Sequence, residues 1–175
     1  MGQFFGQLAR SIVAGPLDDW AQWLLRSIWG MPPLVQTVHI LAVSSVMGSI
    51  VLINLRVLGL ALPRQNASEL VRRLMPWTWW ALPALALSGL VFVFARPQRY
   101  AVNRVFGLKF TLLAGAIVFT ALFQRLTTRD AAFWERSLGH RVAAKIIAGC
   151  SLLLWLGVVL AGRWIAYADY IFPPQ

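Results

Sequence analysis

The sequence predicts an all-α fold, an integral membrane bundle of four transmembrane helices with an N-terminal amphipathic interfacial helix, and three observations support this class. Of the 175 residues, 59% are hydrophobic and only 13% are charged, whereas soluble domains are roughly 45–50% apolar and about one quarter charged. The charged residues cluster between long apolar runs, and Trp and Phe are abundant at 9 and 10 residues. Together these features indicate a polytopic membrane domain and not one large soluble core.

Four apolar runs are long enough to cross the bilayer, which takes about 20 helical residues for about 30 Å of hydrocarbon. They occupy residues 33–62, 77–95, 102–123 and 141–167. We therefore divide the chain into an interfacial segment, residues 1–31, and a four-helix transmembrane domain, residues 32–175.

Prolines predict where these runs end or bend. Pro63, Pro76 and Pro97 stand where the first and second runs are expected to begin or end. Pro83 lies inside the second run, where the missing backbone N–H predicts a kink. The polar residues 129–139 predict a short surface helix before the fourth run.

Residues 16–30 have the pattern of an amphipathic helix. Asp18 and Asp19 fall in its first turn, and Trp20 and Trp23 follow at helical spacing. The segment is too short and too polar to span the bilayer, and its Trp-rich face matches the aromatic belt of membrane interfaces, so we expect it to lie in the interface. The alternative is a soluble cap that packs on the bundle.

The net charge of +10 does not indicate nucleic-acid binding in this sequence. The 16 basic residues stand mostly at the ends of apolar runs, where they fit lipid headgroups and topology signals. The expected partner is therefore the lipid bilayer, with other membrane subunits or a second copy of the chain as further candidates, and no nucleic acid. The single cysteine, Cys150, excludes an intramolecular disulfide.

Acidic residues are missing from the apolar runs. All six lie outside the hydrocarbon-spanning parts, whereas proton-coupled and cation-coupled transporters usually place a carboxylate near mid-membrane. This absence argues against a carboxylate-relay transporter.

Histidine and lysine are the remaining candidates for chemistry. His39 lies one to two turns inside the first run and Lys109 at a similar depth in the third, and because alternate helices begin on the same side, both belong to one leaflet. His140 and Lys145 begin the fourth run from the opposite side. At 1.5 Å per residue, most of a span, roughly 20–30 Å, separates His39 from His140. These two histidines therefore cannot bind one iron.

Both His39 and Lys109 have more than one interpretation. His39 is either a metal ligand or a hydrogen-bonded histidine between helices. A lysine inside the bilayer costs free energy and needs a partner, which for Lys109 is an anionic headgroup, a cofactor carboxylate, or a metal that binds the neutral amine. The catalytic residues, if the chain has any, stay unassigned at this point.

The sequence resembles a known group in two places. His39 within VHILAVSSVMGSIVLINLR, with Gly48 and Arg56 downstream, and the segment FGLKF around Lys109 resemble the first and third helices of the HemJ-type protoporphyrinogen oxidases. They are also similar to the four-helix membrane domains of the CopD type. The resemblance covers about half the chain.

This resemblance implies a b-type haem, with His39 and Lys109 as the residues associated with it. Four arginines stand in the same leaflet and are available for the haem propionates, because charge-assisted pairs with Arg commonly hold carboxylates; they are Arg96, Arg99, Arg104 and Arg163. The implied metal ligands are His39 and Lys109. We therefore expect haem b in an electron-transfer or oxidoreductase role. The alternative is a non-catalytic structural or assembly subunit of a larger membrane complex.

Loop charges predict the orientation. Seven arginines flank one membrane side, namely Arg64, Arg72, Arg73, Arg125, Arg129, Arg136 and Arg141, against six on the other, namely Arg10, Arg26, Arg96, Arg99, Arg104 and Arg163. The positive-inside rule places the first side in the cytoplasm. We thus expect a multi-pass protein of the bacterial inner membrane with both termini in the periplasm.

Reporter fusions test this orientation. Alkaline phosphatase fused to the C-terminus should be active and a green fluorescent protein fused there should be dark, because only the first reporter matures in the periplasm. Fusions ending near Arg72 should give the opposite pair of results. The reverse pattern at both positions would contradict the orientation and leave the number of helices unchanged.

Overall fold

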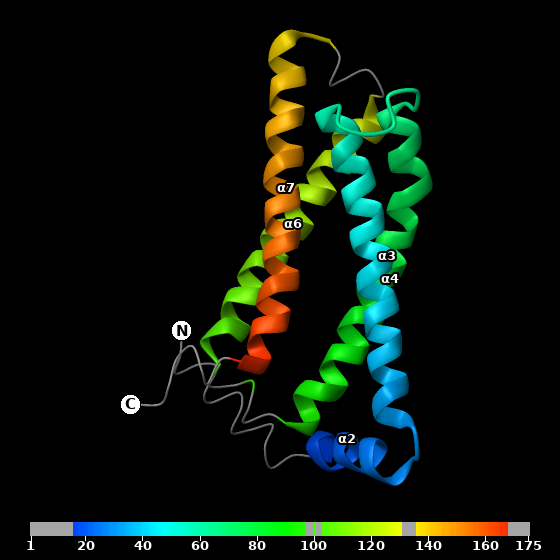
Figure 1. Cartoon of the computed structure of the whole chain (residues 1–175), viewed down its shortest axis with the longest axis vertical. Helices are drawn as coiled ribbons and strands as arrows, with labels where there is room; N and C mark the ends of the chain where they lie inside the picture. Colours follow the sequence, from blue (N-terminus) through cyan, green and yellow to red (C-terminus); the bar gives the residue numbers. More distant parts are fainter. Residues whose placement is uncertain (1–15, 97–99, 101–102, 131–135, 168–175) are drawn as a thin grey trace.

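The predicted fold class is confirmed. The computed structural model describes residues 16–96, 100, 103–130 and 136–167, and its regular structure there is entirely helical. The elements are α2 (Pro16–Ser27), α3 (Met31–Leu58), α4 (Ala67–Ala95), α6 (Arg104–Arg129), α7 (Leu138–Trp164) and the short 3-10 helix η2 (Ile165–Tyr167) (Figure 1). The four long helices α3, α4, α6 and α7 are each long and apolar enough to cross a membrane.

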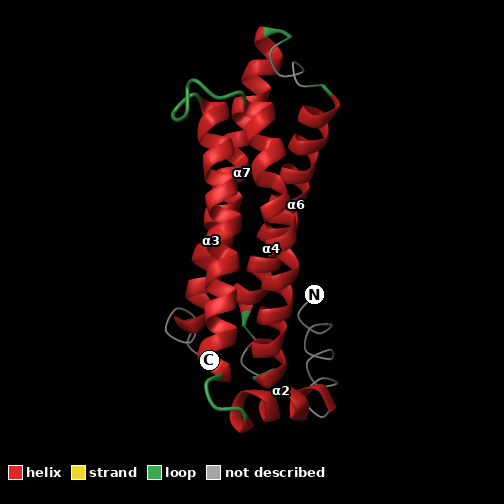
Figure 2. Ribbon diagram, turned by 90° about the vertical axis from the view of Figure 1, so that its right-hand side faces the viewer, coloured by secondary structure: helices red, strands yellow, loops and turns green. Residues whose placement is uncertain are grey.

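The long helices form two antiparallel hairpins, α3 with α4 and α6 with α7. The hairpins meet mainly along α3 and α7, whereas α4 and α6 touch less. Figure 1 shows the two hairpins close together where α3 ends and diverging toward the end where α3 begins. A second view shows the same four helices running side by side with α2 across one end (Figure 2). We call the two halves of the bundle the closed half and the diverging half.

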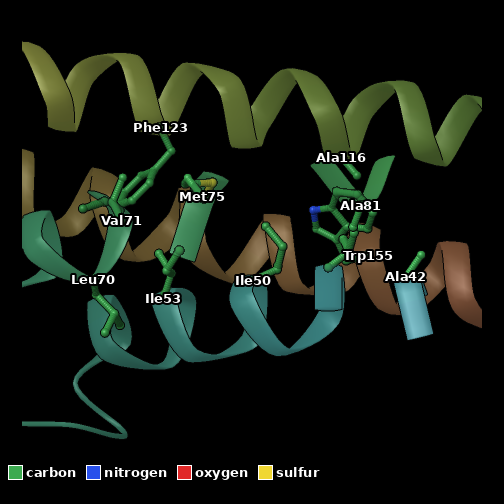
Figure 3. Packing of buried hydrophobic residues seen from close by; sticks show 12 residues of the cluster. Ala42, Ile50, Ile53, Leu70, Val71, Met75, Ala81, Ala116, Phe123 and Trp155 are labelled. Carbon is green, nitrogen blue, oxygen red and sulfur yellow. The ribbon is translucent and has the colours of Figure 1, made fainter. Parts of the chain in front are cut away.

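The hydrophobic core lies in the closed half. Its buried side chains come from all four long helices and point toward one another (Figure 3); the largest fully buried ones are Val46, Ile50, Ile53, Val71 and Met75. In the diverging half a smaller cluster around Val105, Ala161 and Ile165 joins α6 to α7 and η2 and has no described member from α3 or α4. Close packing therefore fixes the four helices in one half and leaves the hairpins less constrained in the other.

Side-chain hydrogen bonds join each neighbouring pair of helices. Asn54 of α3 donates to Ser151 of α7 at 3.4 Å. The Trp79 indole of α4 donates to the Gln124 amide oxygen of α6 at 2.5 Å, and the Trp155 indole of α7 donates to the Thr120 hydroxyl of α6 at 3.1 Å. The fourth pair, α3 and α4, is joined by a histidine and a serine in the diverging half.

Three helix boundaries differ clearly from the sequence prediction: the end of α3, the start of α4, and the end of α6, which continues to Arg129 past the expected residue 123. Helix α3 ends at Leu58, short of residue 62, because Gly59 adopts φ +81° and the Leu60 N–H bonds the Leu55 carbonyl, a common C-terminal cap. The prediction that Pro76 ends a helix is wrong, since Pro76 and Pro83 both lie inside α4. The first turns of α4 form regardless, because Leu70, Val71 and Met75 are buried against the core and Glu69 pairs with Arg73.

Two further predictions fall on the limits of the described residues. Pro97 and residues 131–135 of the surface helix expected over residues 129–139 lie outside them. The described residues of that segment contain the end of α6 at Arg129, an ion pair between Asp130 and Arg136, and the start of α7 at Leu138.

Helix α2 lies across the end of the α3–α4 hairpin (Figures 1 and 2). Ala21 is completely buried, whereas Trp20 and Trp23 are about half exposed and Trp29 is fully exposed. The helix thus packs on the bundle through a small residue and keeps its tryptophans on the outside, the arrangement expected of an interfacial helix. Residues 1–15 of the N-terminal segment lie outside the described residues.

Glycine packing between α6 and α7 gives a test of the fold. A Cβ atom at Gly157 would lie 3.2 Å from Leu112 Cδ1, whereas a Cβ atom at Gly48 would meet nothing within 4 Å. Gly157→Leu should therefore push α6 and α7 apart and cost about 1–3 kcal/mol of stability, measured as a lower thermal unfolding midpoint in detergent. Gly48→Leu is the matched control and should leave the midpoint nearly unchanged. Equal effects of the two variants would contradict the α6–α7 packing.

Candidate functional site

Two of the polar side chains that the sequence singled out, His39 and Lys109, lie in the diverging half. His39 stands one turn before Ala42, the first core residue of α3, and Lys109 stands two turns before Ala116, the first residue of that core on α6. Both side chains are partly buried. The structure therefore places an imidazole on one hairpin and an amine on the other, both just beyond the four-helix core.

His39 is anchored to α4 by a hydrogen bond. Its Nδ1 lies 2.8 Å from the Ser88 hydroxyl. Ser88 is buried, and its oxygen also lies 2.6 Å from the backbone carbonyl of Ala84 and 3.3 Å from that of Leu85. This is the hydrogen bond that the structural interpretation of His39 requires, and it occupies one of the two ring nitrogens.

The hydrogen-bond chain favours one tautomer of His39. A serine hydroxyl has one hydrogen to donate, and the carbonyl of Ala84 can only accept. The shorter contact of Ser88 is to Ala84, and a hydroxyl that donates there accepts from His39 Nδ1–H. Among the described residues no hydrogen bond is made to Nε2. In this tautomer the neutral ring carries its free lone pair on Nε2, the form in which histidine binds a metal.

Lys109 faces α7. A Cβ atom at Gly162 would lie 3.6 Å from Lys109 Nζ and 3.7 Å from Cε, which is ordinary contact distance, so the Lys109 amine lies beside Gly162 of α7. Within the part of the chain that the structure describes, Lys109 has no ion pair and no side-chain hydrogen bond. An amine at this depth without a partner is costly in a membrane.

A small residue stands beside His39 as well. A Cβ atom at Gly89 would lie 3.6 Å from His39 Cε1. Both polar side chains of the site therefore lie against a glycine of the neighbouring helix, Gly89 on α4 and Gly162 on α7.

Hydrogen bonds of one side chain connect the start of α6 to the end of α7 next to the site. The Asn103 side chain accepts from the backbone N–H groups of Val105 and Phe106, which caps α6. Its amide nitrogen donates to the Ile165 carbonyl at 3.1 Å. One residue thereby fixes both the start of α6, which carries Lys109, and the end of α7, which carries Gly162.

The four arginines that were expected to pair with haem propionates lie at different places in the structure. Arg96 is exposed at the end of α4 and Arg163 is exposed in the last turn of α7, where it donates to the Tyr167 hydroxyl at 3.1 Å. Arg104 is the first residue of α6, with only its backbone described, and Arg99 lies outside the described residues. The three that are placed stand at the end of the bundle nearest His39 and Lys109.

His140 lies elsewhere. It is in the first turn of α7, at the end of the bundle opposite the start of α3 (Figure 1), and its Nδ1 lies 2.7 Å from Ser137, the residue that caps this helix. Lys145 is exposed one turn further along α7. The two histidines are thus at different ends of the molecule.

Sequence reasoning did not identify Ser88, Gly89 or Gly162. One signal was present, since Ser88 and Gly89 interrupt the apolar segment ALALSGLVFVFA. The helix register supplies the rest, because His39 lies 19 residues before the last residue of α3 and Ser88 lies 21 residues after the first residue of α4. In an antiparallel hairpin these positions face each other.

His39 and Lys109 together suit a metal that is already coordinated by a cofactor and needs only one or two ligands from the protein. Among the described residues no group of three or more His, Cys, Asp or Glu side chains could hold a metal ion. One imidazole and one amine are too few for a bare ion in a protein-built site. They match the one or two axial positions that a haem leaves to the protein.

The fold and the site define this chain as a four-helix membrane protein with a polar pair between its two hairpins. It belongs to the family described as "Family of unknown function (DUF6644)", whose model matches residues 28–168. The matched region contains the four long helices and the whole site, and it begins just after α2. The chain matches no curated protein and no solved structure.

Cross-linking tests whether the site brings the two hairpins together. In a Cys150→Ser background, a chain carrying His39→Cys and Lys109→Cys should be joined within itself by a short bismaleimide, detected by mass spectrometry of the linked peptides. The control chain, with Lys109→Cys and His140→Cys, should not react in this way, because His140 lies at the other end of the bundle. Equal cross-linking of the two pairs would contradict the described arrangement.

Proposed function

We propose that the chain is a membrane protein that binds b-type haem between its two hairpins and serves in electron transfer or as an oxidoreductase. The proposal rests on one observation, the chain of hydrogen bonds that runs from His39 through Ser88 to the carbonyl of Ala84. In the tautomer that this chain favours, Nε2 of a half-buried imidazole has a free lone pair.

Three features of the described residues fit this cofactor. The diverging hairpins carry an imidazole and an unpaired amine, which are suitable axial or propionate partners. Gly89 and Gly162 keep the space beside these groups free of side chains. Basic residues for two carboxylates stand at the same end of the bundle, with Arg96 and Arg163 exposed there. The resemblance of the segments around His39 and Lys109 to the HemJ-type and CopD-type proteins supports the same cofactor.

A bound haem would supply a one-electron couple at iron, and the residues of the chain would do the rest. His39 would provide the axial nitrogen, and Ser88 would hold its ring. Lys109 would serve either as second ligand, in its neutral form, or as a cation that pairs with a propionate. The apolar surroundings of the helices would exclude water and, with the axial ligand, set the reduction potential.

Absorption spectra of purified variants test the proposal. His39→Ala should abolish or strongly shift the Soret band, because it removes the axial nitrogen. His140→Ala is the matched control and should leave the spectrum unchanged. Full haem occupancy in His39→Ala, or loss of haem in His140→Ala alone, would overturn the assignment of the site. A wild-type protein without haem would favour the structural or assembly subunit instead.

Two substitutions of Lys109 separate its two roles in the same experiment. Lys109→Met removes both the amine ligand and the charge, so it should alter the low-spin bands or the occupancy in either case. Lys109→Arg keeps the positive charge but cannot bind iron, since the guanidinium does not lose its proton. An unchanged spectrum in Lys109→Arg therefore indicates a propionate partner, and a spectrum like that of Lys109→Met indicates an axial ligand.

A further inference from the structure

Within the described part of the chain, Ser88 is the one buried side chain that makes a hydrogen bond to His39. It lies on α4, which the sequence had not connected with the site. Its hydroxyl makes two contacts with backbone carbonyls of its own helix, at Ala84 and Leu85, in addition to the imidazole. A serine in a membrane helix commonly donates its hydroxyl hydrogen to a backbone carbonyl of the preceding turn. Ser88 therefore does not need the imidazole for its own hydrogen bonding, and His39 is an additional partner.

We infer that Ser88 is the positioning residue of His39, which keeps Nδ1 protonated and presents Nε2 to a metal. The effect of Ser88 on haem binding rests on the proposed function. The position of the proton on the His39 ring is a property of the protein without any cofactor. Ser88 acts through His39 and does not touch the cofactor. A serine oxygen is a neutral acceptor, so it orients the ring without giving it the strongly basic character that a carboxylate partner would.

The geometry around the ring supports this role. Ser88 is fixed on the helix by its contact with Ala84, so the oxygen has little freedom to follow the imidazole. At Gly89, the next residue, an added Cβ atom would lie 3.6 Å from Cε1, the ring atom between the two nitrogens. The ring is thereby held on its Nδ1 side by α4. In the described part of the chain the Nε2 side has no protein hydrogen bond.

Nitrogen-15 NMR of the haem-free protein in detergent tests the proton assignment without any cofactor. In a His140→Ala background His39 is the only histidine of the chain. At a pH where the ring is neutral, we expect a protonated Nδ1 and an unprotonated Nε2. Ser88→Ala should give a mixture of the two tautomers, and Ser88→Thr should restore the original one, because threonine also bonds the carbonyl four residues earlier. A protonated Nε2 in the parent protein would overturn the inference.

The haem-loaded protein gives the second readout. Loss of an outer-shell partner typically weakens metal binding about 10-fold to 100-fold, so Ser88→Ala should lose haem affinity in that range and shift the midpoint potential upward, since a less basic imidazole favours ferrous iron. Ser88→Thr should retain both properties. An unchanged affinity and potential in Ser88→Ala would contradict the positioning role.

Ser151→Ala is the matched control for both measurements. Ser151 is 5% exposed and Ser88 is 6% exposed, and each accepts a hydrogen bond from another helix. Ser151→Ala should therefore affect packing to a similar degree but leave the tautomer and the potential unchanged. If both variants shift them equally, Ser88 has a structural role only. If the NMR result is as expected and the protein binds no haem, the proposed function fails and the orientation of His39 by Ser88 stands.

Discussion

The requirement that polar groups inside hydrocarbon find partners within the protein governs this bundle. No water is available there to replace a missing hydrogen bond, so a polar side chain on one helix has to be met by a polar side chain on another. Each neighbouring pair of long helices is joined by such a bond, and three of the four lie in or next to the hydrophobic core of the closed half, from Asn54, Trp79 and Trp155. The fourth, between His39 and Ser88, lies beyond that core. It is the one bond that involves a group able to bind a metal or change its protonation state.

The two halves of the bundle differ in how their helices pack. In the closed half, core residues from all four helices hold the hairpins in one arrangement. In the diverging half, α6 and α7 are joined by a small cluster and by Asn103, while α3 and α4 are joined through His39. The polar groups His39 and Lys109 thus lie on different hairpins, beyond the core that joins all four helices. Ligand and cofactor sites of helical bundles are commonly built from side chains on facing helices.

Much of the fold was predictable from the sequence, whereas only part of the site was. The four helices follow from long apolar runs, because few other structures tolerate that composition. The end of α3 was misplaced because Leu60 and Leu62 continue the apolar pattern past Gly59, whose φ of +81° stops the helix. Pro76 was assigned to a helix end because its local effect is unfavourable, but burial of Leu70 and Met75 outweighs it. His39 and Lys109 stood out as polar residues in apolar runs. Ser88 and Gly162 did not, because serine and glycine are frequent in membrane helices for packing alone, and only the register of the hairpins assigns them to the site.

We propose that His39 and Lys109 hold a haem and that Ser88 orients the imidazole. The reduced-minus-oxidised absorption spectrum of the wild-type protein, purified in mild detergent and combined with quantification of the extracted haem, tests it most directly. The account predicts the difference spectrum of a b-type haem and an amount of haem equimolar with the chain. A colourless protein from cells that are replete in haem, or haem in trace amounts only, would contradict it.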